Sequence, residues 1–143
     1  MRVGVLGALL TTFLAGQAMA QSYSKQESLY IHCLTEAGNL HGGINYLSQI
    51  GEDVGPDDVR NVRAVYYAWF IMAYDVFLQE QGAGTDALES ALDAGAARFK
   101  QEVDHTNLED RVAEAEEAVR ICMAQIGEAR TYEMVEKYLA EQD

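Results

Sequence analysis

His32 and Glu36 are the pair of residues best placed for metal chemistry, because they stand four positions apart. On a helix this spacing puts both side chains on one face, and an imidazole with a carboxylate makes half of a zinc site. Zinc needs two further ligands, which no spacing in the sequence specifies. The commoner explanation is a surface histidine beside a carboxylate. His41 does not complete the site, because nine residues of continuous helix place it about 180° from His32.

Motifs of hydrolytic and redox enzymes are missing from the sequence. It contains no G-x-S-x-G arrangement to present a nucleophilic serine. It also contains no C-x-x-C pair for redox chemistry or, with a following histidine, for haem attachment. We therefore expect a protein that is not an enzyme, with no catalytic residue, no metal ligand and no cofactor.

The two cysteines, Cys33 and Cys122, fall on apolar stripes of two different predicted helices. One lies near the start of the first helix and the other near the end of the fourth, so an antiparallel bundle brings them together. In an oxidising compartment such a pair forms a structural disulfide, and two inert buried thiols are the alternative. A bond that closes a loop of this length contributes about 4.5 kcal/mol in the chain-entropy model.

The compartment is indicated by residues 1–20, which have the three parts of a secretory signal peptide. Arg2 gives a basic start, residues 3–14 an apolar segment, and Ala18-Met19-Ala20 a small-residue cleavage site. About 12 apolar residues are too few to cross the ~30 Å hydrocarbon core of a bilayer. We expect cleavage after Ala20, a single helical domain over 21–143, a periplasmic or secreted location and no membrane insertion of the mature chain.

The chain is strongly acidic, with 23 Asp and Glu against 10 Lys and Arg and a net charge of −13. Removal of residues 1–20 takes away Arg2 and no acid, so the mature chain carries −14. Nucleic acids and anionic lipids are bound by clustered Lys and Arg, which the sequence lacks, so we expect neither partner. Acidity most often serves solubility, and the other explanation is attraction of a basic protein partner or of cations.

The densest acidic cluster lies between residues 109 and 117, with Arg111 as its one cation. Such a cluster is usually a solvated helix face, and the alternative is a surface that docks a basic partner. Neither this region nor the acidic turn near residue 53 has the spacing of a calcium-binding loop. The acidic candidates for an interaction surface are Glu109, Asp110, Glu114 and Glu117.

Apolar residues recur with helical spacing along the mature chain, which contains one proline. A first helix is predicted from about Ser24 to Ile50, and its glycines near His41 allow a kink or break there. A second runs from Pro56 to about Gln81.

Capping signals open two more helices, at Asp86 with Glu89 and at Thr106 with Glu109. A break near Gly127 should precede a short fifth helix over residues 131–141, because an unbroken helix would place its apolar residues on the wrong side. The fold class we predict is all-α: a four-helix-bundle-like domain with a short fifth C-terminal helix, in which a disulfide joins the first and fourth helices.

The second predicted helix is apolar around most of its circumference between residues 64 and 78. A helix of this kind is buried on several sides or covered by a partner. Core packing is the first explanation, and a surface for a partner, for a second copy of the chain or for an apolar ligand is the second. The aromatic candidates for an interaction surface are Trp69, Tyr66 and Tyr74.

These observations favour a non-enzymatic exported protein that acts by binding another protein, such as an inhibitor, an immunity-type neutraliser, or a periplasmic adaptor or chaperone. A first alternative is a bundle that encloses a small apolar ligand or cofactor, with Trp69, Tyr74 and Met72 as walls. A second is a metal enzyme built on carboxylates such as Glu36 with His32. The aromatic helix can also join two copies of the chain.

Overall fold

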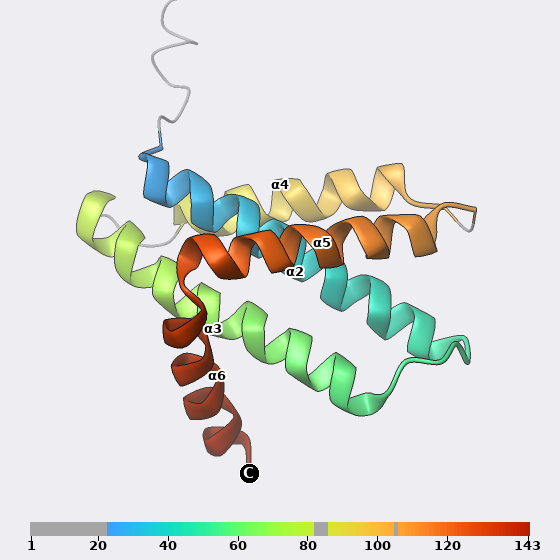
Figure 1. The fold of residues 1–143 in the computed structure, drawn as a ribbon. Coiled ribbons are helices and arrows are strands. Elements are labelled where there is room, and N and C mark those ends of the chain that lie inside the picture. The colour runs from blue at the N-terminus through green and yellow to red at the C-terminus, as the bar shows by residue number, and fades with distance from the viewer. Residues whose placement is uncertain (1–22, 82–85, 105) are drawn as a thin grey trace, which may run out of the picture.

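The computed structural model describes residues 23–81, 86–104 and 106–143, and the regular elements within these ranges are all α-helices (Figure 1). They are α2 (Lys25–Gln49), α3 (Pro56–Gln81), α4 (Asp86–Glu102), α5 (Leu108–Ile126) and α6 (Glu128–Gln142). The all-α prediction is confirmed, as is the disulfide between the first and fourth helices of the predicted bundle, which are α2 and α5. The predicted signal peptide lies outside the described residues. In the described part of the chain, no helix has the length and apolar character needed to cross a membrane.

α2 is one continuous helix, so the break that its glycines near His41 allowed does not occur. A capping box begins it: Glu27 N–H donates to Ser24 Oγ (3.1 Å), and Ser24 N–H donates to Glu27 Oε1 (2.9 Å). Packing explains one of these glycines, Gly43. A Cβ on Gly43 would lie 2.5 Å from Val112 Cγ2, so its absence lets α5 approach α2 closely.

The break between α5 and α6 is confirmed at Gly127, whose φ of +118° interrupts the helix. Its N–H donates to the Met123 carbonyl at 3.0 Å and so closes the last turn of α5. α6 begins directly afterwards at Glu128, three residues earlier than predicted. A positive φ is accessible to glycine at little cost, which is why the chain turns at this position.

The predicted caps of α4 and α5 are wrong. Asp86 is the first residue of α4 instead of its cap. Thr106 donates its hydroxyl to the Asp104 carboxylate at 2.6 Å, and α5 starts only at Leu108. Asn107 stabilises the turn instead, because its side chain accepts from Asp104 N–H (2.8 Å) and donates to the Glu102 carbonyl (2.9 Å). These side-chain bonds compete with the local capping signal.

α2 is the central helix and contacts α3, α4 and α5, while α6 packs on α3 and α5. α2 and α5 are antiparallel, as two contacts between them show. Cys33 is bonded to Cys122, and Gly43, ten residues after Cys33, lies beside Val112, ten residues before Cys122. Within the described residues, the backbone of α5 does not come close to that of α3 or of α4. Each of these helices therefore keeps a face that no other described helix covers.

Two groups of buried residues form the core. The disulfide cluster draws on α2, α3, α4 and α5 and comprises Tyr30, Cys33, Leu34, Ala37, Trp69, Met72, Ala73, Phe77, Leu88 and Cys122. The Leu47 cluster draws on α2 and α5 alone and comprises Leu40, Ile44, Leu47, Val112 and Ala115. Valines 54, 59 and 62 pack against it from the α2–α3 turn and the start of α3.

Candidate interaction surfaces

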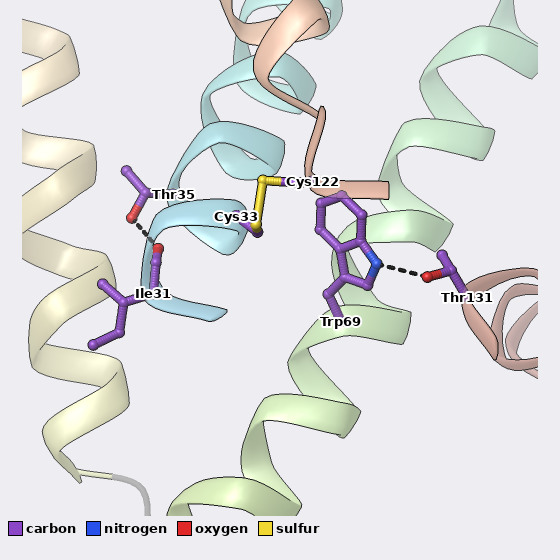
Figure 2. The surroundings of a disulfide bond; sticks show 6 residues. All are labelled: Ile31, Cys33, Thr35, Trp69, Cys122 and Thr131. Atoms are coloured by element: carbon purple, nitrogen blue, oxygen red, sulfur yellow. Dashed lines mark hydrogen bonds between the residues drawn. A yellow bond between two sulfur atoms is a disulfide. The ribbon is translucent and has the colours of Figure 1, made fainter. Parts of the chain in front are cut away.

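Trp69, the central aromatic candidate, is a core residue with no exposed surface. Figure 2 shows its ring beside the Cys33–Cys122 disulfide, between the ribbons of α2 and α6. Its Nε1–H donates to Thr131 Oγ1 at 3.0 Å, and the Thr131 hydroxyl donates to the Gly127 carbonyl at 2.8 Å. This chain of hydrogen bonds satisfies the buried indole and ties α3 to the start of α6. For Trp69, core packing is therefore the explanation that fits.

The opposite side of α3 exposes a row of large apolar side chains, which we call the outer stripe. Its members follow helical spacing and are about equally exposed: Tyr67 (42%), Ile71 (41%), Tyr74 (41%) and Leu78 (38%). At one end, Tyr67 stacks on Tyr138 of α6, with ring centroids 5.2 Å apart and planes 19° apart. Sequence reasoning named Tyr74 alone of these four, although their i, i+4, i+7, i+11 spacing was readable.

Tyr66, the third aromatic candidate, is half-buried and lies against Gly38 of α2. Burial raises the pKa of its hydroxyl, and the nearby Tyr67 and Asp93 raise it further. Tyr66 is therefore neutral at physiological pH and packs between α2 and α3, so it adds little to an exposed surface.

The acidic candidates on α5 are all exposed, and two of them are paired within the same helix. Glu114 accepts from Arg111 at 3.1 Å, and Glu117 is paired with Arg120. Within the described residues, Glu109 and Asp110 have no ion pair. The two acidic candidates without an ion pair therefore lie in the first turn of α5, where carboxylates suit the helix dipole.

The outer stripe and the acids of α5 do not form one surface. α2 lies between α3 and α5. The stripe lies on the side of α3 away from the core, whereas Glu109 and Asp110 line a groove between α2 and α5, and Glu114 lines the groove between α2, α4 and α5. The two candidate regions therefore lie on different sides of the molecule.

His32 and Glu36 line a groove of about 480 Å³ between α2, α4 and α5. Arg111 crosses this groove, with Glu114 at 3.1 Å and Glu102 at 3.8 Å. In the described part of the chain, no group of three His, Cys, Asp or Glu residues is arranged to share a metal ion. His41 lies on the other side of α2, where burial and the positive charge of Arg63 lower its pKa.

Two further grooves adjoin each other at the end of α2, and both are lined by Tyr46 and Leu108. The larger, about 560 Å³, is mainly apolar, and its other lining residues are Gly42, Gly43, Phe99, Lys100, Val103 and Asp104. The smaller, about 330 Å³, is also lined by Leu47, Ile50, Glu52, Thr106, Glu109 and Asp110. The predicted ligand walls lie elsewhere, since Trp69 and Met72 are buried in the core while Tyr74 is on the outer stripe.

Comparison of the chain with protein-family models, curated protein sequences and solved structures finds no match. The function is therefore inferred from the surfaces of the molecule itself.

Proposed function

We propose that this chain is an exported, non-enzymatic binding protein that engages a protein partner through the outer stripe of α3. The roles in keeping with this are an inhibitor, an immunity-type neutraliser, or a periplasmic adaptor or chaperone. Export is supported by the sequence of residues 1–20 and by the buried disulfide between Cys33 and Cys122.

The exposure of the outer stripe is the observation that carries this proposal. Single exposed apolar residues are ordinary, but four large ones in a row along one helix form a continuous surface. Tyrosine and large aliphatic side chains contribute apolar area to interface centres, and tyrosine is enriched among the residues that dominate binding energy.

The stripe is held on a rigid support, because the other sides of α3 are packed. α2 and α6 contact the helix, and the hydrogen bond from Trp69 to Thr131 fixes its middle against α6. A preordered helix face loses less side-chain and backbone entropy on binding than a flexible loop does. Asp75, which lies beside the stripe and is exposed, adds a negative charge that favours a partner with a basic rim.

The test is a cross-linked pull-down from the native envelope fraction, with mass spectrometry of the captured proteins. It compares the wild type with Ile71→Glu, which puts a charge in the middle of the stripe, and with Gln79→Glu, which adds the same charge at an exposed position of α3 outside the stripe. We expect one stoichiometric protein with the wild type and with Gln79→Glu, and about a tenfold lower yield with Ile71→Glu.

Circular dichroism and the urea midpoint should match in all three proteins, since the changes are on the surface. Recovery of the partner by Ile71→Glu at the wild-type level would contradict the assignment to the stripe. A wild-type dimer in light scattering that Ile71→Glu converts to a monomer would assign the stripe to self-association instead.

A further inference from the structure

The grooves at the end of α2 lie where α4 leaves the core. α4 contributes Leu88 to the disulfide cluster, whereas none of its described residues belongs to the Leu47 cluster. Figure 1 shows the second half of α2 diverging from α4. We call the space between them the apolar trough, and define it by Gly42, Tyr46, Ile50, Phe99, Val103 and Leu108.

The trough is open and exposes apolar atoms. Nothing lies within 4 Å of the position that a Cβ on Gly42 would take, so the floor of the trough is empty at this point. Tyr46 is 41% exposed, and Ile50, at the end of α2, is 55% exposed. The volumes of the two grooves fall in the range of sites that enclose ligand side chains or small molecules.

The rim of the trough is acidic. Glu52, Glu109 and Asp110 line the smaller groove, and Asp104 lines the larger one. Of the described residues that line either groove, Lys100 is the one with a positive charge. Within the described part of the chain, no Lys or Arg forms an ion pair with Glu52, Glu109 or Asp110. These three carboxylates can therefore form ion pairs with a molecule bound in the trough.

We propose that the apolar trough binds a basic amphipathic polypeptide segment of a partner protein. Apolar side chains of the segment fill the space over Gly42 and between Tyr46 and Phe99, and its Lys or Arg side chains pair with the carboxylates of the rim. Burial of apolar area supplies affinity, while the opposite charges steer the segment and fix its orientation.

The charge of the rim decides against other occupants. The head group of a fatty acid or an anionic lipid would meet the carboxylates of Glu52, Glu109 and Asp110 and be repelled. A second copy of this chain, with its net charge of −13, would be repelled in the same way. The trough involves α2, α4 and α5 and is separate from the outer stripe on α3, so this inference does not depend on the proposed function.

The test uses two fluorescein-labelled helical peptides and fluorescence anisotropy. One peptide is amphipathic and built of leucine and lysine, and its counterpart has glutamate at every lysine. We expect the purified protein to bind the leucine–lysine peptide, with a Kd that rises with salt, and to bind the glutamate peptide at least about tenfold more weakly. Equal binding of the two peptides, or no binding of the first, would overturn the proposal.

A matched pair of variants at one position locates the site. Gly42→Trp fills the trough, whereas Gly42→Ala places a methyl group in open space. We expect Gly42→Trp to weaken binding of the leucine–lysine peptide at least about tenfold and Gly42→Ala to leave it within about twofold. Unchanged binding by a folded Gly42→Trp protein would overturn the assignment.

A charge variant keeps the test decisive if Gly42→Trp fails to fold. The double change Glu109→Lys with Asp110→Lys affects two exposed side chains and should lower affinity for the leucine–lysine peptide about tenfold at low salt.

Ile71→Glu, on the outer stripe, should leave peptide binding unchanged. Loss of binding in Ile71→Glu would assign the peptide to the outer stripe and overturn the proposal. Binding of a neutral apolar dye that Gly42→Trp blocks, without peptide binding, would assign the trough to a small apolar ligand and overturn it too.

Discussion

The two halves of α2 lie in different surroundings. Around Cys33, the first half packs against residues of α3, α4 and α5, and Trp69, Phe77, Leu34 and Leu88 have no exposed surface. Around Leu47, the second half meets buried residues of α5 and partly buried valines of the α2–α3 turn and α3, and Ile44, Leu47 and Val112 retain 8 to 9% exposure. One end of the bundle is closed and covalently linked, and the other is open.

This difference indicates how a small bundle combines stability with a binding surface. Large buried side chains and a disulfide stabilise the closed end, so the open end can leave apolar side chains in contact with solvent. Regions with fewer buried contacts also open more readily, which is typical of binding surfaces. We therefore expect changes at the two ends to differ in what they affect.

The largest effect should come from removing the disulfide with Cys33→Ala and Cys122→Ala together. The bond closes a loop of 89 residues, and its loss should lower the free energy of unfolding by about 4.5 kcal/mol in the chain-entropy model. Urea unfolding of the double variant and of the wild type measures this loss. A loss below about 1 kcal/mol would mean that the closed end does not depend on its cross-link.

A smaller effect is expected where α5 approaches α2 in the open half. Gly43→Ala puts a methyl group 2.5 Å from Val112 Cγ2, and such overpacking costs about 1–3 kcal/mol. Gly42→Ala is the matched control: its methyl group meets open space, and replacing glycine within a helix should stabilise the protein by up to about 1 kcal/mol. Equal urea midpoints for the two variants would contradict the close packing of α5 on α2.

Adding Val112→Ala sharpens this comparison, because it removes the methyl group that Gly43→Ala would meet. The double variant should lose less stability than the sum of the two single variants, which is the signature of direct contact. Strict additivity would indicate that Gly43→Ala acts through something other than Val112.

The smallest effect concerns His41, which lies in the open half of α2. Burial and Arg63 lower its pKa below the ordinary 6.5, so the unfolded chain takes up the proton at a higher pH than the folded chain does. The contribution of neutral His41 to the free energy of unfolding is fully present above pH 6.5. This contribution is lost as the pH falls from 6.5 toward the lowered pKa of the folded state. His41→Gln should therefore reduce the difference in unfolding free energy between about pH 7.5 and about pH 5.5.

His32→Gln, at an exposed position on the other side of α2, is the control and should keep the wild-type difference. If both variants behave alike, burial beside Arg63 is not the source of the pH dependence.

Local sequence signals predicted the helices well where nothing else competed for the same groups. Pro56 begins α3, and Gly127 ends α5, because a fixed φ and a positive φ act within a single residue. The cap at Thr106 failed because Asp104 takes its hydroxyl group. The break that the glycines near His41 allowed does not occur, and Gly43 instead lies where α5 packs closely on α2.

The candidate surfaces could be predicted only in part. Tyr74, Glu109 and Asp110 were named from the sequence and do lie on exposed surfaces, whereas Trp69 is buried. When a helix is apolar around most of its circumference, its sequence does not reveal which side meets the core, because apolar residues occur on every side. The trough was not predicted, because it joins residues from three helices that are distant in the chain.

By itself, the sequence determined the helical class, the partner of each cysteine and the position of the last break, because periodicity, cysteine number and glycine conformation are properties of short segments or of composition. Only the tertiary structure decided that α2 is central, that one side of α3 is exposed and that α4 contributes to the disulfide cluster but not to the Leu47 cluster. These features depend on how closely helices approach, and approach is set by pairs such as Gly43 with Val112 and Gly95 with Thr35, which lie far apart along the chain.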